Sequence, residues 1–183
     1  NSIFMVLYNF FYFKGTQIGF AGTGGVLVTT LNPILTSIFS SLFKYDTLPR
    51  KDWVGLFIGF LAGGIILRIW DINFSIFYSS GNLFFIMASL SWVAVTITTS
   101  KSKEKISFSS YSFWTFLTSA LISLVFVPNN SLFSIITFDL LFWINLIILS
   151  VFAMAFGTSV YFYASTKLGP KKASSYIFLV PFT

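Results

Sequence analysis

The chain has 183 residues, of which 56% are hydrophobic and only 9% are charged, with eleven Lys and Arg against five Asp and Glu. A soluble domain carries about 25% charged residues, whereas this chain has a mean hydropathy of +0.86. The absence of His and Cys excludes disulfides, thiol chemistry, His-based catalysis and the commonest zinc sites. We therefore expect an all-α polytopic membrane protein that is not an enzyme and needs no cofactor, metal or nucleic acid.

Apolar runs separated by short polar connectors predict seven helical segments. A helix needs about 20 apolar residues to cross roughly 30 Å of hydrocarbon. The runs do not alternate as barrel strands would, and in lipid the backbone must satisfy its own hydrogen bonds, so we expect helices. In chain order the predicted segments are 1–13, 19–43, 53–70, 82–100, 107–127, 140–164 and 172–183. The first and the last are too short to cross, and we expect them to belong to spans of a longer protein.

Almost all charge lies in the connectors, apart from Arg68 two residues before the end of its run, and the distribution gives the predicted topology. Nine of the eleven basic residues lie in connectors 44–52, 101–105 and 167–172, and the alternate connectors hold only Lys14 and Arg68. Basic residues in short loops mark the cytoplasmic side of a membrane. These three connectors are therefore predicted to be cytoplasmic, and the protein to be a multi-pass protein, most simply of a bacterial inner (plasma) membrane.

Two stretches of the chain form a weak internal repeat. Residues 17–35 and 166–183 each contain a connector followed by an apolar run that reaches a proline, at Pro33 and Pro181. An odd number of predicted crossings separates them, so the two units would be inverted relative to each other. Inverted repeats are an architecture of secondary transporters.

The same stretches carry a family resemblance. The run SVYFYASTKLGPKKASSYIFLVP (159–181) resembles the signature of EamA-type permeases of the drug/metabolite transporter superfamily. Residues 30–67 resemble the end of the other EamA repeat, with Pro33 and Trp53 at matching positions and Asp46 where the family usually has Glu. ASLSWVAVT (88–96) resembles the first helix of a second repeat.

This resemblance implies a bundle of ten transmembrane helices built from two inverted five-helix repeats. Residues 1–72 would be the end of the first repeat, helices three to five. Residues 73–183 would be the second repeat without its last helix, so the chain would be truncated at both ends.

Small residues in two segments predict close helix packing. Gly55, Gly59 and Gly63 are four residues apart and share one helix face, which lets another backbone approach. Ala153 and Gly157 form a similar stripe in segment 140–164. Static packing is the simpler interpretation of both stripes. The functional alternative is a sliding or rocking seam for the glycine stripe, and access of Tyr161 and Tyr163 to a cavity for the stripe in segment 140–164.

Polar and aromatic side chains on single helix faces indicate a substrate cavity. Pro33 lacks an N–H, so the carbonyl of Thr29 loses its helical donor beside the amide of Asn32. Trp92 lies at mid-span between hydroxyl residues, which suits a cavity wall. A healed proline kink and a packed Trp are the competing interpretations. The candidate cavity residues are Thr29, Asn32, Pro33, Ser89, Trp92, Thr96, Tyr161, Tyr163 and Pro181.

The resemblance implies a permease that moves a small metabolite, such as an amino acid or a drug-like solute, by alternating access; it suggests efflux and also allows import. Its partners would be that small-molecule substrate and the lipid bilayer, and the oligomeric state stays open. The predicted spans hold no carboxylate, Lys or Arg at mid-depth, which disfavours proton coupling within this part and a sugar-phosphate cargo. The alternative is a non-transporting membrane scaffold or assembly protein.

Overall fold

The computed structural model describes residues 1–43, 49–71, 81–102, 107–127 and 135–182, except for the side chains at 50, 71, 181 and 182. Within these ranges every regular element is helical. The elements are α1 (Ser2–Ile18), α2 (Ala21–Leu42), α3 (Arg50–Ile66), η1 (Ile69–Asp71), α5 (Asn82–Lys101), α6 (Phe108–Val125), η3 (Ile135–Thr137), α8 (Leu140–Ile147), η4 (Ile148–Gly157), α9 (Thr158–Leu168), α10 (Pro170–Ser175) and η5 (Tyr176–Phe182).

Four helices of the described ranges are long and apolar enough to span a bilayer. They are Ala21–Leu42, Asn82–Lys101, Phe108–Val125 and the continuous helix Leu140–Leu168, which joins α8, η4 and α9. Helices α1 and α3 have 17 residues each, which gives a length of about 25 Å at 1.5 Å per residue. The helical fold confirms the predicted class, a polytopic helical membrane protein.

The helices extend further into the polar connectors than the hydropathy pattern predicted. Lys14 was expected in a connector, yet α1 continues through it to Ile18. Asp52 lies in the first turn of α3, which begins at residue 50 instead of the predicted 53. The reason is that an apolar run marks the part of a helix that lies in lipid, whereas Lys and Gln continue a helix readily in water.

The connector between α9 and α10 is a single residue. Gly169 has φ of 85°, a region that glycine adopts without the steric cost paid by other residues. Pro170 follows at the first position of α10, where its missing N–H is not needed by the helix. Lys171 and Lys172, predicted to lie in a longer connector, therefore sit in the first turn of a helix.

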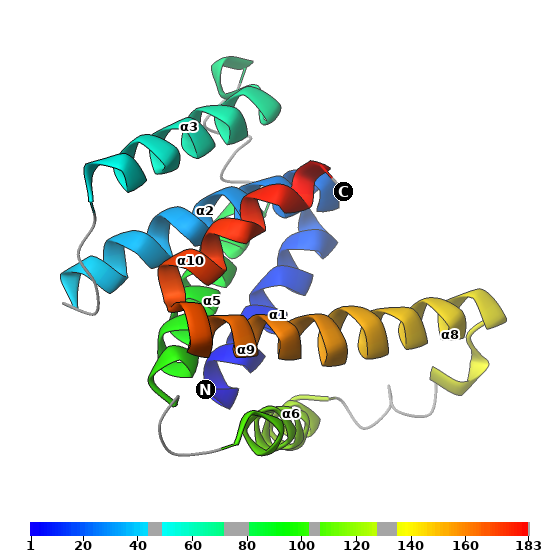
Figure 1. The fold of residues 1–183 in the computed structure, drawn as a ribbon. Coiled ribbons are helices and arrows are strands. Elements are labelled where there is room, and N and C mark those ends of the chain that lie inside the picture. The colour runs from blue at the N-terminus through cyan, green and yellow to red at the C-terminus, as the bar shows by residue number, and fades with distance from the viewer. Residues whose placement is uncertain (44–48, 72–80, 103–106, 128–134, 183) are drawn as a thin grey trace.

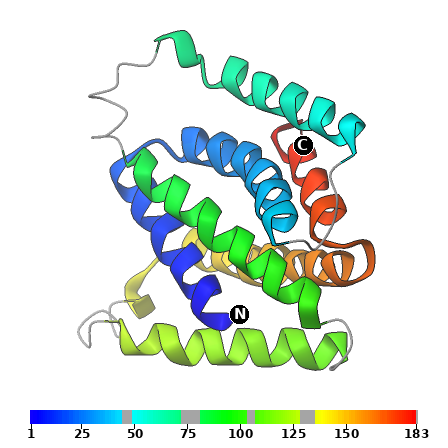
Figure 2. The same cartoon turned by 90° about the vertical axis from the view of Figure 1, so that its left-hand side faces the viewer.

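Helix α5 is the centre of the bundle. It packs along α1 and α2 and also against α9, and Figure 2 shows α1 and α5 side by side. Ten of its side chains are buried. The fully buried ring of Phe85 fits where Gly15 and Gly24 lack side chains, since a Cβ there would lie only 2.7 Å and 2.2 Å from it.

A second cluster joins three helices that are distant in sequence. Met5 of α1, Val95 of α5 and Phe162 of α9 are buried together. Tyr111 and Phe116 of α6 pack against this cluster, and their rings lie 5.7 Å and 6.3 Å from the ring of Phe162. The packing fixes α9, and with it Tyr161, relative to α5.

The helix formed by α8 and η4 extends beyond the bundle (Figure 1). It is rich in large apolar residues that remain exposed, such as Phe152 and Phe156. The segment η4 has π-helical hydrogen bonding over ten residues, and all of it is apolar apart from Ser150. Such a surface is suited to lipid, because its side chains are apolar and a helix satisfies its own backbone hydrogen bonds.

Candidate substrate cavity

Three aromatic side chains from three helices form a continuous row in the interior. The ring of Tyr8 on α1 lies 4.7 Å from the ring of Trp92 on α5, at an interplanar angle of 50°. The ring of Trp92 lies 5.4 Å from that of Tyr161 on α9, at 36°. Tilted and offset aromatic pairs of this kind are favourable, so the row fixes the relative positions of α1, α5 and α9.

A hydroxyl pair orients one end of this row. The Thr96 hydroxyl donates a hydrogen bond to the carbonyl oxygen of Trp92, one turn earlier, at 2.9 Å. Its only proton is thereby used, so the Tyr161 hydroxyl, at 2.9 Å, must donate to the Thr96 oxygen. Thr96 is fully buried. The phenol is therefore held with its oxygen toward α5.

A cavity of about 390 Å³ lies beside the other end of the row. Its walls come from α1, α2 and η5 and include Tyr8, Tyr12, Gly22, Gly25, Thr29 and Val180. A Cβ at Gly22 or Gly25 would meet no atom within 4 Å. The absence of side chains at these two positions therefore leaves open space beside the backbone of α2, which the cavity occupies. Tyr8 belongs to both the cavity wall and the aromatic row, which makes the two features contiguous.

Buried polar groups continue along α2. Asn32, Thr36 and Ser40 are spaced four residues apart, which places them on one helix face, and none of them is more than 3% exposed. Their side-chain oxygens have no hydrogen-bond partner among the described residues, and the same holds for the buried hydroxyl of Ser89 on α5. Buried polar groups are usually hydrogen-bonded, so these oxygens keep unused hydrogen-bonding capacity, although none of the four residues lines the cavity beside Tyr8.

The predicted cavity residues do not all come together. Trp92, Thr96 and Tyr161 form one cluster, and Thr29 lies on the cavity wall with its hydroxyl donating to the carbonyl of Gly25 at 2.8 Å. The other predicted residues on these helices, Asn32, Pro33 and Ser89, are buried in α2 and α5.

Tyr163 lies apart from this cluster. It is 49% exposed, its ring is 5.5 Å from that of Phe108, and the ammonium of Lys167 lies 5.8 Å from it. The side chain of Pro181 is outside the described residues. A role in substrate binding stays a prediction for all nine residues.

Sequence reasoning missed Tyr8 and Tyr12. They are four residues apart and so share a face of α1, and their rings stack at 5.8 Å. The aromatic-rich run 8–13 was visible in the sequence. However, a single short segment gives no indication of which neighbouring helix its aromatic face will meet.

The predicted packing residues fall into two groups. A Cβ at Gly59 would lie 2.5 Å from the ring of Phe178, and one at Gly63 would lie 2.3 Å from Thr30, so α3 approaches η5 and α2 closely at these points. Gly55 meets no such neighbour, and Ala153 and Gly157 are exposed. The packing role of the two stripes stays a prediction.

The spanning helices define a polytopic helical membrane protein. Residues 79–183, more than half of the chain, match the model of the EamA-like transporter family. The chain belongs to the EamA-like transporter family, as the signature at 159–181 indicated. Searches of the curated proteins and of the solved structures found no match to the chain. The division into repeats at residue 72 stays a prediction.

Proposed function

We propose that this protein exports a small amphipathic metabolite, such as an amino acid or a drug-like solute, across the bacterial inner membrane by alternating access. The observation that carries the proposal is the position of Tyr8. One part of its side chain lines the 390 Å³ cavity, and its ring packs on Trp92. A solute in the cavity would therefore act directly on the contact between α1 and α5.

The chemistry of the walls supports an amphipathic solute. Valines and glycines make most of the cavity surface apolar, while the two tyrosines supply phenol groups. Sites for small molecules are commonly apolar with a few polar groups that fix orientation. Further along the same helix, the buried oxygens of Asn32 and Thr36 have no hydrogen-bond partner among the described residues, so a solute that reached them would find unused acceptors.

The cavity and the aromatic row also suit alternating access. Tyr8 and Thr29 precede residue 72, the predicted boundary between the repeats, while Trp92, Tyr161 and Val180 follow it. In transporters with inverted repeats, one repeat rocks against the other around a site at their interface. Rocking would separate the rings of Tyr8 and Trp92 and would change the shape of the cavity that Tyr8, Thr29 and Val180 line.

Trp92→Ala tests this proposal. We expect export from cells that produce the protein to fall at least about tenfold, because the aromatic row loses its middle member, while the amount of folded protein in the membrane changes much less. Trp114→Ala is the matched control, since Trp114 on α6 is 59% exposed. Asn32→Leu should behave like Trp92→Ala. If both interior variants lost only folded protein, with export per molecule unchanged, the scaffold alternative would replace the transporter mechanism.

A further inference from the structure

The cavity of about 390 Å³ beside Tyr8 has two walls of different character. Helix α1 contributes the large rings of Tyr8 and Tyr12, whereas α2 contributes Gly22 and Gly25, which have no side chains. The space that a solute finds here therefore depends on whether either wall can move and on which residues occupy these two positions of α2.

The aromatic wall is held in place by rings of α5. The ring of Tyr8 lies 4.7 Å from that of Trp92, and the ring of Tyr12 lies 5.8 Å from that of Phe85, at an angle of 66°. Phe85 is itself fully buried. Because close-packed interiors yield little, a solute cannot push the two tyrosines back without disturbing the contact between α1 and α5.

The backbone of α2 is also fixed at the level of the cavity. Gly24 lies against the same Phe85 ring, since a Cβ at Gly24 would lie only 2.2 Å from it. On the cavity side, the hydroxyl of Thr29 donates to the carbonyl of Gly25 at 2.8 Å and to that of Val26 at 3.1 Å. Neither wall is therefore free to widen the cavity.

Neither backbone conformation nor close packing explains glycine at positions 22 and 25. Both residues lie inside α2 without a positive φ, so any L residue could adopt their conformation. In contrast to Gly24, a Cβ at Gly22 or Gly25 would meet no described atom within 4 Å. Glycine is also less favourable than alanine inside a helix. What these two positions provide is open space.

The two glycines follow the cavity from its exposed side inward. They are three residues apart and so share a helix face, and Gly22 is exposed whereas Gly25 is half-buried. Because both line the cavity, a side chain at either position would occupy space that a solute needs.

We propose that Gly22 and Gly25 set the largest solute that this cavity admits, and that the solute is an amphipathic molecule without net charge. The inference rests on the proposed function, since it concerns the cavity proposed to hold the transported solute. The described lining residues are Tyr, Gly, Val and Thr, none of which is charged, and burial of an unpaired charge is costly. A hydrophobic pocket distinguishes solutes that differ by one methylene by roughly 10–200-fold.

Thermal unfolding of the purified protein in a neutral detergent tests the inference without a transport assay. The probes are the N-acetyl amides of alanine, valine, leucine, phenylalanine and tryptophan, which share one uncharged polar head and differ in side-chain size. A ligand that binds only the folded state raises Tm with its concentration, so each titration gives an apparent affinity. The quantity compared between variants is the ratio of the affinity for the phenylalanine probe to that for the alanine probe.

Larger side chains at the two glycines should select against the larger probes. We expect Gly25→Leu to lower the affinity ratio at least about tenfold, because the added side chain and the phenyl ring compete for the same space. Gly25→Ala should lower it less, and so should Gly22→Leu at the more exposed position. If Gly25→Leu does not fold, Gly25→Ala takes its place, since alanine favours a helix and its Cβ meets no described atom.

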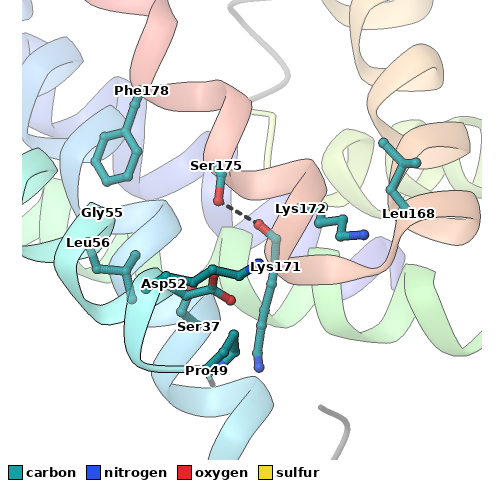
Figure 3. A pocket seen from close by; sticks show the side chains of 11 residues that line it. Ser37, Pro49, Asp52, Gly55, Leu56, Leu168, Lys171, Lys172, Ser175 and Phe178 are labelled. Atoms are coloured by element: carbon teal, nitrogen blue, oxygen red, sulfur yellow. Dashed lines mark hydrogen bonds between the residues drawn. The ribbon is translucent and has the colours of Figure 1, made fainter. Parts of the chain in front are cut away.

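Gly55→Leu is the matched control. A Cβ at Gly55 of α3 also meets no described atom within 4 Å, but Gly55 lines a second and larger cavity, of about 710 Å³, whose wall includes Lys171 (Figure 3). The two cavities share no described lining residue. Gly55→Leu should therefore keep the affinity ratio of the parent protein.

The inference is overturned if no probe stabilises the parent protein, if the Gly25 variants keep the parent ratio, or if Gly55→Leu lowers the ratio as much as they do. Its failure is distinguishable from that of the proposed function. If Trp92→Ala stops export while Gly25→Leu leaves the ratio unchanged, the proposed function stands and this inference fails. If Gly25→Leu lowers the ratio while Trp92→Ala leaves export per molecule unchanged, the size-selective cavity stands and the proposed function fails.

Discussion

Helix α5 and the helix formed by α8 and η4 have similar apolar character and opposite surroundings. The most apolar 18-residue stretch has a mean hydropathy of 1.7 in α5 and 2.3 in the helix Leu140–Leu168. Of the residues in the first stretch 44% are buried, whereas none in the second is buried. The difference lies in the kind of residue. Helix α5 is rich in Ser, Thr and Ala, which permit close packing between membrane helices, whereas α8 and η4 carry mainly large apolar side chains.

Hydrophobicity alone does not mark the interior of a membrane protein. Lipid is as apolar as leucine, so large apolar residues have no preference for the bundle. Small and polar residues do prefer it, since they gain packing and hydrogen bonds there. In this chain the interior is therefore identified by Ser89, Thr96 and Thr99, not by the most hydrophobic run.

The largest expected effect is that of Phe85→Ala. The Phe85 ring is fully buried between α1, α2 and α5, so its removal should lower the free energy of unfolding by about 3–5 kcal/mol. Phe152→Ala, in the exposed π-helical segment, should change it by less than about 0.5 kcal/mol. Unfolding in mixed micelles of neutral and anionic detergent measures both. If both variants lowered the free energy of unfolding equally, the difference in burial between the two helices would be contradicted.

Gly24→Ala should have the next largest effect. The added Cβ would lie 2.2 Å from the Phe85 ring, and overpacking of this kind costs about 1–3 kcal/mol. Gly25→Ala is the control one position away, where a Cβ meets nothing within 4 Å. It should be neutral or stabilising by up to about 1 kcal/mol, because Ala favours a helix. Similar destabilisation by both would argue against the close approach of α2 to Phe85.

Tyr161→Phe should have the smallest effect of the three. It removes the hydrogen bond to Thr96 while keeping the ring on Trp92, so we expect a loss of about 0.5–1.5 kcal/mol. Tyr163→Phe, at an exposed position, should cost nothing measurable. A double-mutant cycle with Thr96→Val isolates the pair, and a coupling energy of zero would contradict the hydrogen bond.

The sequence allowed the main helices to be predicted, but not their ends. Segments 19–43, 82–100 and 107–127 lie within a few residues of α2, α5 and α6, because an apolar run of this length has few alternatives in lipid. The ends were misplaced at Lys14 and Asp52, where the helix continues into polar sequence.

The site was predictable only within single helices. A helical wheel groups Trp92 with Thr96, since both lie on α5, but it cannot show that Tyr8 of α1 packs on the same indole. The stripe through Ala153 and Gly157 assumes a regular α-helix, whereas η4 has wider π turns that rotate its residues differently. Contacts between helices therefore needed the structure.

The one-residue joint at Gly169 has a mechanical consequence. Tyr161 lies eight residues before it, against Trp92, and Lys171 lies two residues after it, in the wall of the larger cavity. Because a single residue connects them, α9 and α10 have little freedom to move independently, so a tilt of α9 also moves α10. We therefore expect a displacement of Tyr161 against Trp92 to change the position of Lys171 as well.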